Sequence, residues 1–226
     1  LKYHLGKTIE CSKKNINLIH IFDFEWVNKK EIIKSILKSK LGIYKTKIGA
    51  RKCIIKRLSV DESKEFLENN HIQGYAPSSI RLGLFYNNEL VSHLAISKNR
   101  FKKGTYEIVR YVSKINYSVQ GGLSKLWKEA KKQLNDSFTL ISYVDKRFFT
   151  GKSNGSIGLE YKYSNRPAYY YTKDYKSIEN RMLYQKKNIE KKLKFYDSKL
   201  TEWENMKLNG YDRIWDCGTD VWMLKK

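Results

Sequence analysis

The sequence of 226 residues predicts an α+β fold whose sheet is mainly antiparallel. Three strand-like runs follow one another closely, at 80–86, 89–97 and 105–113. Asn87-Asn88 suits a tight hairpin turn between the first two runs. An amphipathic helix over about 122–134 then leads into a strand at 138–144. With two prolines and no Ser/Gly-rich linker, the chain predicts elements that pack closely together.

The segments on either side of this central run also have regular patterns. The expected elements before it are a helix at 2–14, a strand at 16–22, a helix at 29–41 between the Asn28 N-cap and Gly42, a strand at 53–58, a helix at 62–69 and a small-residue loop at 74–79. Those after it are a tyrosine-rich strand at 168–172, a helix at 178–195, a shorter helix at 200–207 and a closing strand pair within 209–224.

The chain carries a large positive charge, since 45 Lys+Arg stand against 23 Asp+Glu, a net charge of +22. Such a surface attracts polyanions, and nucleic acid is the partner that we expect, with DNA favoured over RNA and no membrane partner. The alternative is that most of these lysines are merely solvated. The residues expected to bind nucleic acid are Lys29, Lys30, Lys34, Lys38, Arg51, Lys52, Lys162, Arg166, Arg181, Lys186 and Lys187.

Three cysteines, Cys11, Cys53 and Cys217, lie far apart and form no CxxC pair, which argues against a disulfide framework or a zinc site. No apolar run approaches the roughly 20 residues of a membrane span, and the first residues do not resemble a secretory leader. We therefore expect a cytoplasmic protein. Because the chain begins at Leu1 rather than Met, we also expect it to be part of a longer protein.

Common catalytic motifs, including the P-loop, HExxH and GxSxG, are missing from the sequence, so function must follow from combinations of residues. One such combination interleaves tyrosines with cations over 161–173. Rings and cations in this order suit stacking on unpaired bases together with phosphate contacts. The helix expected at 178–195 would present a basic face that either follows phosphates or is only solvated.

Four short motifs carry a family resemblance: Asn70-His71 before the small-residue loop, Glu107–Arg110, Gly121–Ser124 and Ser142–Asp145. With them, residues 53–172 resemble the GNAT acyltransferases, in particular the DNA-modifying Mom-type enzymes of bacterial viruses. The resemblance implies a GNAT-like mixed, mainly antiparallel sheet with flanking helices. It also implies splayed strands and a helix N-terminus at Gln120, Gly121 and Gly122 that would bind the pyrophosphate of acetyl-CoA or a related acyl-CoA. The glycine turn is out of register with the usual family pattern.

By the same resemblance, Asp145 would act as the general base towards an exocyclic amine, with Ser124 nearby. Tyr143, Arg110 and His71 would line the cleft. Structural alternatives stand beside these roles: Ser124 as a helix cap, Asp145 paired with Lys146 or Arg147, and Arg110 paired with Glu107. His93 and His20, each within an apolar run, are expected to be packed core residues.

A second resemblance rests on both ends of the chain, over the segments His4–Thr8, Leu18–Trp26, Ala50–Cys53 and Asn209–Gly218. These resemble the C-terminal portion of phage and mobile-element homing endonucleases related to very-short-patch-repair nucleases. The resemblance implies a helix-strand-helix remnant of a restriction-endonuclease-like domain over 1–48, a GNAT-like module over 49–175 and a basic helical tail with a closing strand pair over 176–226. Asp23 and Glu25, two apart at a strand end, would face one side and share Mg²⁺.

Three functional hypotheses follow. The first is a nucleic-acid-binding protein, the DNA-recognition part of a homing-endonuclease-like protein whose cleavage core, and with it any use of Mg²⁺, would lie outside this chain. The alternative is a Mom-type, acyl-CoA-dependent N-acyltransferase that modifies a base amine in DNA or RNA. A third class, a structural protein packaged with nucleic acid, would bind without catalysing a reaction.

Overall fold

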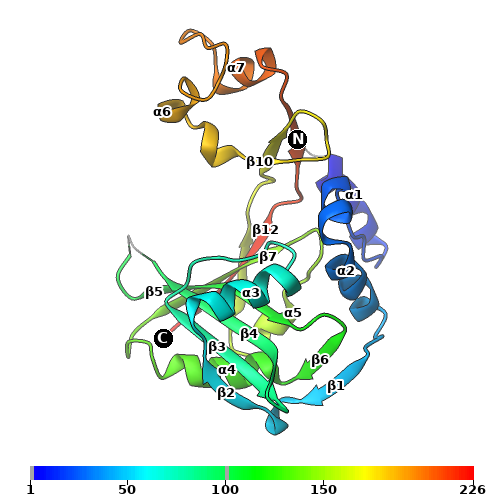
Figure 1. Cartoon of the computed structure of the whole chain (residues 1–226), viewed down its shortest axis with the longest axis vertical. Helices are drawn as coiled ribbons and strands as arrows, with labels where there is room; N and C mark the ends of the chain where they lie inside the picture. The colour runs from blue at the N-terminus through cyan, green and yellow to red at the C-terminus, as the bar shows by residue number, and fades with distance from the viewer. Residues whose placement is uncertain (1–2, 100–101) are drawn as a thin grey trace. The chain divides into compact units, whose positions relative to one another are not determined.

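The computed structural model describes residues 3–99 and 102–226, without the side chains of Lys186 and Lys187 (Figure 1). The chain forms two compact units. Unit 1 comprises Leu1–Asn28, Asp145–Phe149 and Asn165–Thr219, and unit 2 comprises Lys29–Val144, Thr150–Ser164 and Asp220–Lys226. This division differs from the predicted boundaries after residues 48 and 175, because each unit is assembled from segments that are distant in the sequence.

A seven-stranded sheet dominates unit 2, in the order β2-β3-β4-β5-β7-β12-β8. The strands are β2 (Ile54–Arg57), β3 (Ile80–Tyr86), β4 (Glu89–Lys98), β5 (Thr105–Ser113), β7 (Thr139–Asp145), β8 (Glu160–Ser164) and β12 (Thr219–Lys225). Neighbouring pairs from β2 to β5 are antiparallel, as is the β12·β8 pair, whereas β5 and β7 are parallel. The predicted α+β fold with a mainly antiparallel mixed sheet is therefore confirmed.

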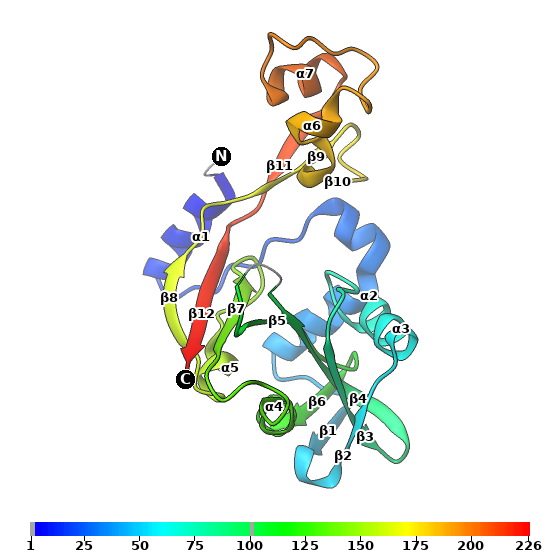
Figure 2. The same cartoon turned by 90° about the vertical axis from the view of Figure 1, so that its left-hand side faces the viewer.

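Helices cover both faces of this sheet (Figure 2). On one face, α4 (Gly122–Lys131) inserts Leu126 and Trp127 among Leu84, Leu94 and Leu140. On the other, α3 (Val60–Asn70) buries Ser63, whose hydroxyl lies 2.8 Å from Nε2 of His93. His93 is fully buried, as the sequence predicts. A Ser59/Glu62 capping box begins α3, and α5 (Lys152–Gly155) completes the helices assigned wholly to unit 2.

Strands β5 and β7 pair over only part of their length. Thr105–Ile108 is in register with Thr139–Ser142, and beyond these residues the two strands have no pairing. The parting begins where β5 contains a bulge, since Ile96 opposes Ile108 while Ala95 opposes Arg110, which leaves Val109 as the extra residue. A bulge bends its strand and increases the local twist, so β5 diverges from β7 at this point.

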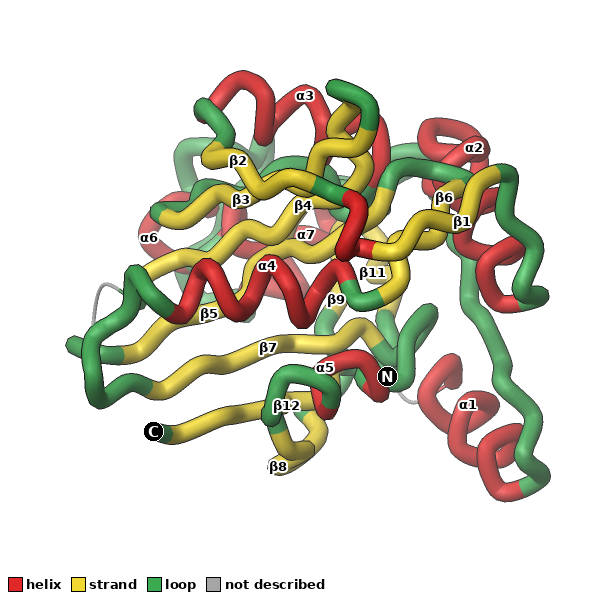
Figure 3. The backbone as a smooth tube through the Cα atoms, turned by 90° about the horizontal axis from the view of Figure 1, so that it is seen from below, coloured by secondary structure: helices red, strands yellow, loops and turns green. Residues whose placement is uncertain are grey.

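A small parallel sheet pairs β1 (Thr46–Gly49) with β6 (Tyr117–Gln120). Its last register pair joins Gly49 to Gln120, so the 3₁₀ turn Ala50–Lys52 that follows β1 lies at the same end as the glycines that follow β6. Figure 3 shows this turn beside the start of α4. A Cβ added to Gly121 would lie 3.9 Å from the Cβ of Ala50.

Unit 1 combines helix α1 (Tyr3–Lys13) and the first turns of α2 (Asp23–Lys40) with a sheet in the order β10-β9-β11. Its strands are β9 (Tyr169–Thr172), β10 (Glu179–Asn180) and β11 (Asp212–Trp215), and its shorter helices are η2 (Arg181–Tyr184), α6 (Lys186–Ile189) and α7 (Glu202–Leu208). Tyr171, Tyr184, Ile189 and Met206 form a buried cluster. Most of its polar ends are satisfied locally, for example by Tyr171 Oη donating to Glu202 at 2.6 Å.

Three predicted elements are wrong. Residues 16–22 form no strand, because no neighbouring strand pairs with them, and the predicted helix-strand-helix remnant is therefore not formed. The helix expected over 178–195 is divided into β10, η2 and α6. Asn180 caps the 3₁₀ helix η2, which places Tyr184 in the buried cluster with Tyr171, Ile189 and Met206. The closing strands exist but do not pair with each other, because β11 pairs with β9 and β12 with β8.

Helix α2 begins at Asp23, six residues earlier than predicted, and the helical path is interrupted at Lys29 (φ −134°, ψ 33°). None of the helices that the structure describes is long and apolar enough to cross a membrane.

Candidate functional site

The parting of β5 and β7 is the feature of unit 2 around which a site forms. Without a bulge, Glu107 and Arg110 would point to opposite faces of the sheet, because side chains alternate along a strand. Because Val109 is an extra residue, Glu107 lies opposite Ser97 and Arg110 lies opposite Ala95. Ser97 and Ala95 are on the same face of β4, so Glu107 and Arg110 also share that face. This face is opposite to the one that Leu94, Ile96 and Ile108 share in the core beneath α4.

Glu107 lies opposite Ile141, one residue before the last residue pair that joins β5 to β7. Burial raises the pKa of its carboxyl above the usual range, and the positive charge of Arg110 opposes that shift only in part. A carboxylate with a raised pKa is a better proton acceptor than an ordinary surface glutamate. In the sequence, Glu107 belongs to a motif of the GNAT resemblance and pairs with Arg110 in the structural alternative, but it has no predicted catalytic role, because neither the bulge nor the burial is visible there.

Tyr143 joins the same face from β7. Glu107 is in register with Ile141, and Tyr143 follows two residues later, so its side chain returns to the face of Glu107. The Tyr143 side chain is 45% exposed. Partial burial raises the pKa of its phenol, and the nearby charges of Glu107 and Tyr163 raise it further. The phenol therefore keeps its proton at neutral pH and is available as a donor.

Tyr163 reaches this face through a second bulge. Val221 opposes Tyr163 and Trp222 opposes Tyr161, so Lys162 is the extra residue on β8. Tyr161 packs against Trp222 with ring centroids 6.2 Å apart, whereas Tyr163 lies on the opposite face with its side chain 52% exposed. We call Glu107, Arg110, Tyr143 and Tyr163 the β5–β7 cluster.

His71 and the loop after α3 border this cluster. Arg110 Nε donates to the carbonyl of Gly74 at 2.9 Å, which ties the strand to the loop. The backbone N–H of Gln73 donates to Nδ1 of His71 at 3.1 Å. Burial, followed by the charges of Arg110 and Lys29, lowers the pKa of His71 to about 3. His71 is therefore a neutral imidazole at physiological pH, which suits positioning rather than proton donation.

The depressed pKa of His71 predicts acid sensitivity. Between pH about 6.5, the ordinary pKa of His, and pH about 3, His71 is protonated in the unfolded chain but stays neutral in the folded chain. The free energy of unfolding should therefore fall as pH falls through this window, by at most about 1.4 kcal/mol per pH unit from this group. Replacing His71 by Asn should remove this contribution. Denaturant titrations of both proteins at pH 7 and pH 5 test it, and equal losses of stability on acidification would contradict it.

The start of α4 is the second half of the site. Gly121 adopts φ +74°, and no side chain caps the helix. A Cβ on Gly122 would lie 2.9 Å from Tyr111 Oη, so only glycine fits there without a shift. The first N–H groups of a helix have no partners within it, so this turn can accept an anion.

Positive charge surrounds this turn. Lys125 Nζ donates to the carbonyls of Ala50 at 2.9 Å and Cys53 at 2.5 Å, which fixes the 3₁₀ turn beside α4. Arg51 and Lys52 of that turn are exposed. Of the three predicted cofactor contacts, Gln120 ends β6, while Gly121 and Gly122 form the bare helix start. The hydroxyl of Ser124 lies 3.4 Å from that of Ser156.

Asp145 has a different environment from the one that a general base needs. Arg147 binds both of its oxygens, with Nη2 2.9 Å from Oδ2 and Nε 3.3 Å from Oδ1. The Arg147 backbone N–H also donates to Oδ1 at 2.9 Å. Asp145 therefore pairs with Arg147, as the structural alternative expected. It belongs to unit 1, whereas the β5–β7 cluster belongs to unit 2.

The prediction that Asp23 and Glu25 share a Mg²⁺ ion at a strand end is wrong. Asp23 and Glu25 lie in the first turn of α2, not on a strand, and residues two apart on a helix point in different directions. Glu25 is buried and binds Arg147 Nη1 at 2.9 and 3.0 Å as well as the N–H of Phe22 at 3.0 Å. Within the described residues, no group of three or more His, Cys, Asp or Glu side chains is arranged to hold a metal.

The residues predicted to contact nucleic acid come from several elements, including α2, the Ala50–Lys52 turn, β8 and η2. Lys30, Lys38, Arg51, Lys52, Lys162, Arg166 and Arg181 are exposed. Lys29 lies 3.7 Å from Glu68, Lys34 2.8 Å from Glu31, and Lys162 2.8 Å from Glu160. Exposed pairs of this kind are weak and leave the charge available to phosphates. The side chains of Lys186 and Lys187 lie outside the described part of the structure, and the helix expected to carry them is much shorter.

No family model matches the sequence, and no curated protein matches it. Among solved structures, the chain is similar to a Bacillus subtilis acetyltransferase in complex with CoA, with 16% identity, 77% of this chain and 99% of that chain covered, and a TM-score of 0.44. The ribosomal-protein-S18-alanine N-acetyltransferase of Escherichia coli has 10% identity, coverages of 76% and 93%, and a TM-score of 0.43. A GNAT family acetyltransferase from Elizabethkingia anophelis with acetyl-CoA bound has 10% identity, coverages of 77% and 99%, and a TM-score of 0.42. Similarities this distant say nothing about function. The functional argument rests on the geometry of unit 2.

Proposed function

We propose that unit 2 is an acyl-CoA-dependent N-acyltransferase. The observation that carries the proposal is the parting of the parallel strands β5 and β7 directly after Ile108 and Ser142, beside a partly buried Glu107. The edge of β5 that no longer pairs with β7 would lie beside an extended cofactor arm. A proton acceptor and a proton donor, Glu107 and Tyr143, stand on one face at the place where they part.

The residues of unit 2 fit the phosphates of such a cofactor. No N-cap side chain bonds the start of α4, and although the N–H of Leu123 donates to Tyr111 Oη, the neighbouring N–H groups and the helix dipole favour negative charge there. Arg51 and Lys52, on the neighbouring turn, add two exposed cations. When bound, acyl-CoA would supply an acyl group activated as a thioester. In this proposal Arg51 and Lys52 bind phosphate rather than nucleic acid, which replaces their expected role.

The remaining residues would act on the acceptor amine. Glu107 would take the proton that the amine loses when its nitrogen forms the new amide bond, while the C–S bond of the thioester breaks and a proton returns to the departing sulfur, so that CoA leaves as the free thiol. Tyr143, whose phenol stays protonated at neutral pH, would donate a hydrogen bond on the same face. Arg110 and neutral His71 would be positioning residues, since Arg110 ties β5 to the loop at Gly74.

Replacing Ser124 by Asp separates cofactor binding from folding. Ser124 is the third residue of α4, where a carboxylate interacts favourably with the helix dipole. The same carboxylate would repel the cofactor phosphates. We therefore expect S124D to unfold at the same temperature as the unmodified protein, or slightly higher, and to lose at least about tenfold in acetyl-CoA affinity by calorimetric titration.

The control for this experiment is Gln133→Glu, which makes the same change in net charge just beyond the other end of α4. Q133E should bind acetyl-CoA as the unmodified protein does. Equal weakening in both variants would mean that only net charge matters. Unchanged affinity in S124D would rule out the start of α4 as the phosphate site.

A further inference from the structure

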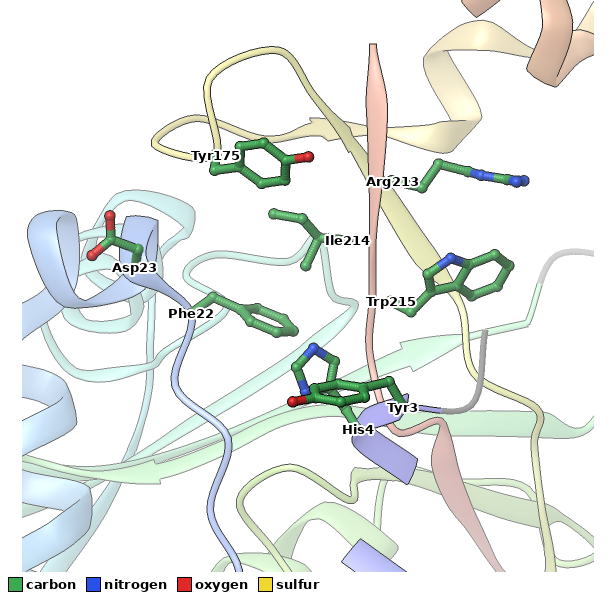
Figure 4. A pocket seen from close by; sticks show the side chains of 8 residues that line it. All are labelled: Tyr3, His4, Phe22, Asp23, Tyr175, Arg213, Ile214 and Trp215. Carbon is green, nitrogen blue, oxygen red and sulfur yellow. The ribbon is translucent and has the colours of Figure 1, made fainter. Parts of the chain in front are cut away.

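Unit 1 contains a cavity of about 340 Å³ that the proposed acyl transfer does not use (Figure 4). Its volume lies within the range of roughly 300–1,000 Å³ that is typical of small-ligand pockets. The cavity follows strand β11, with the rings of Tyr3, His4, Phe22, Tyr175 and Trp215 in its lining. All of its lining residues belong to unit 1. A cavity so rich in rings suits a flat, aromatic ligand.

The walls of the cavity are arranged for contact with a ring. In Figure 4, Phe22 and Ile214 extend toward each other from separate segments, while Tyr3 and His4 lie on one side of them and Tyr175 on the other. His4 meets Phe22 edge to face, with centroids 5.6 Å apart. Tyr175 is 53% exposed, so much of its ring remains free for an incoming ligand. Aromatic side chains with free faces stack on any nucleobase.

Two polar side chains of the lining, Arg213 and Asp23, offer the groups that a phosphate and a base would need, and Figure 4 shows Arg213 extending from β11 away from Ile214 and Phe22. The guanidinium of Arg213 lies 3.8 Å from the ring centroid of Trp203 and 5.3 Å from that of Trp215. Stacking fixes the plane of a guanidinium and leaves its N–H edge for a phosphate. Asp23, the exposed carboxylate of the lining, is an acceptor for the amino or imino N–H of a base. The cavity therefore combines ring stacking, one cation and one acceptor.

Further cations of unit 1 lie on rings near this lining. Lys7 Nζ is 4.3 Å from the ring centroid of Tyr3, and Lys173 Nζ is 4.4 Å from that of Tyr211. Arg181 lies 4.8 Å from the centroid of Tyr169. A free mononucleotide would need one of these charges, whereas a strand would use several. The net charge of +22 favours a polyanion over a small monoanion.

We propose that the cavity along β11 binds one unpaired base of a single-stranded nucleic acid, stacked on its aromatic lining, with an adjoining phosphate on Arg213. Lys7, Lys173 and Arg181 meet the flanking phosphates. This site is independent of acyl transfer in unit 2, and its test uses no acyl donor.

The test is the affinity of the full chain for a short fluorescein-labelled oligothymidylate, measured by fluorescence anisotropy at about 150 mM salt. Arg213→Gln should weaken binding by about tenfold or more, and so should Tyr175→Ala, because each removes a contact in the cavity. The controls are Lys199→Gln, which removes one positive charge as Arg213→Gln does, and Tyr196→Ala, both at exposed positions of unit 1 outside the lining. The controls should bind within about twofold of the unmodified protein.

Two further measurements keep the proposal falsifiable if a variant folds poorly. An oligonucleotide carrying 5-bromodeoxyuridine, irradiated with the unmodified protein, should form adducts on the peptides that contain Tyr175 or Trp215. Thymidine monophosphate should compete only at far higher concentration than the oligonucleotide. Adducts confined to other peptides, equal weakening by R213Q and K199Q, or full competition by the mononucleotide at the oligonucleotide's own affinity would each overturn the proposal.

Discussion

Replacing Glu107 by Gln should lower the turnover of acyl transfer by at least about a hundredfold, because the variant loses the proton acceptor of the β5–β7 cluster. The acetyl-CoA affinity should not change, since Glu107 lies apart from the helix start that would hold the phosphates. Transfer is measured as the release of free CoA thiol with the best acceptor from a set of primary amines and oligonucleotides. Glu160→Gln, an exposed carboxylate on β8, is the matched control.

The pH dependence adds a sign to this prediction. Because burial raises the pKa of Glu107, the rate should fall as pH falls through that raised value, and E107Q should lack this acid limb. Folding has the opposite dependence on this group. The folded chain holds the Glu107 proton more tightly than the unfolded chain does, so the ionised carboxylate reduces stability at neutral pH. E107Q should therefore be at least as stable at pH 7 as the unmodified protein. A variant that is both active and less stable would contradict the assignment.

Replacing Arg147 by Met should destabilise unit 1 by about 3–5 kcal/mol, because the buried Glu25 and the largely buried Asp145 lose their common partner. The Arg147 side chain is 4% exposed, and it binds Glu25, itself 7% exposed, as well as Asp145. Its guanidinium also lies 4.5 Å from the ring centroid of Phe22. Denaturant titration at pH 7 measures the loss.

A further variant separates the lost ion pair from lost packing. The triple variant E25Q/D145N/R147M should recover much of the stability, since it leaves no buried charge without a partner. A loss below about 1 kcal/mol in R147M at pH 7 would show that the cluster contributes little to the fold.

Much of the fold of unit 2 was predictable from the sequence, because its strands and helices have strong local patterns. The runs at 80–86 and 105–113 coincide with β3 and β5, and Asn87-Asn88 adopts positive φ angles of 49° and 61°, as a tight hairpin turn requires. The predictions failed where long-range packing decides the structure. The local pattern of residues 178–195 predicts a helix, but Tyr184 and Ile189 are buried in the cluster with Tyr171 and Met206, and a continuous helix is not formed.

The candidate site was predictable only in part. Tyr143, Arg110, His71 and the glycines at 121 and 122 were expected near a cleft, and the structure places all five in unit 2. The bulge at Val109, which puts Glu107 and Arg110 on one face, depends on how β4 pairs with β5. The engagement of Asp145 by Arg147 likewise depends on the position of Glu25, 122 residues away from Arg147. Neither arrangement leaves a local signal in the sequence.

Hydrogen exchange of the full chain, measured with and without acetyl-CoA, tests the central proposal most directly. Bound cofactor should slow exchange of the N–H groups at the start of α4 and in the part of β5 beyond Ile108, which pairs with β4 but not with β7. The same protection should be missing in S124D. Exchange that acetyl-CoA leaves unchanged at both places, at concentrations up to the millimolar range typical of weak substrate binding, would contradict the assignment of unit 2 as an acyl-CoA-dependent transferase.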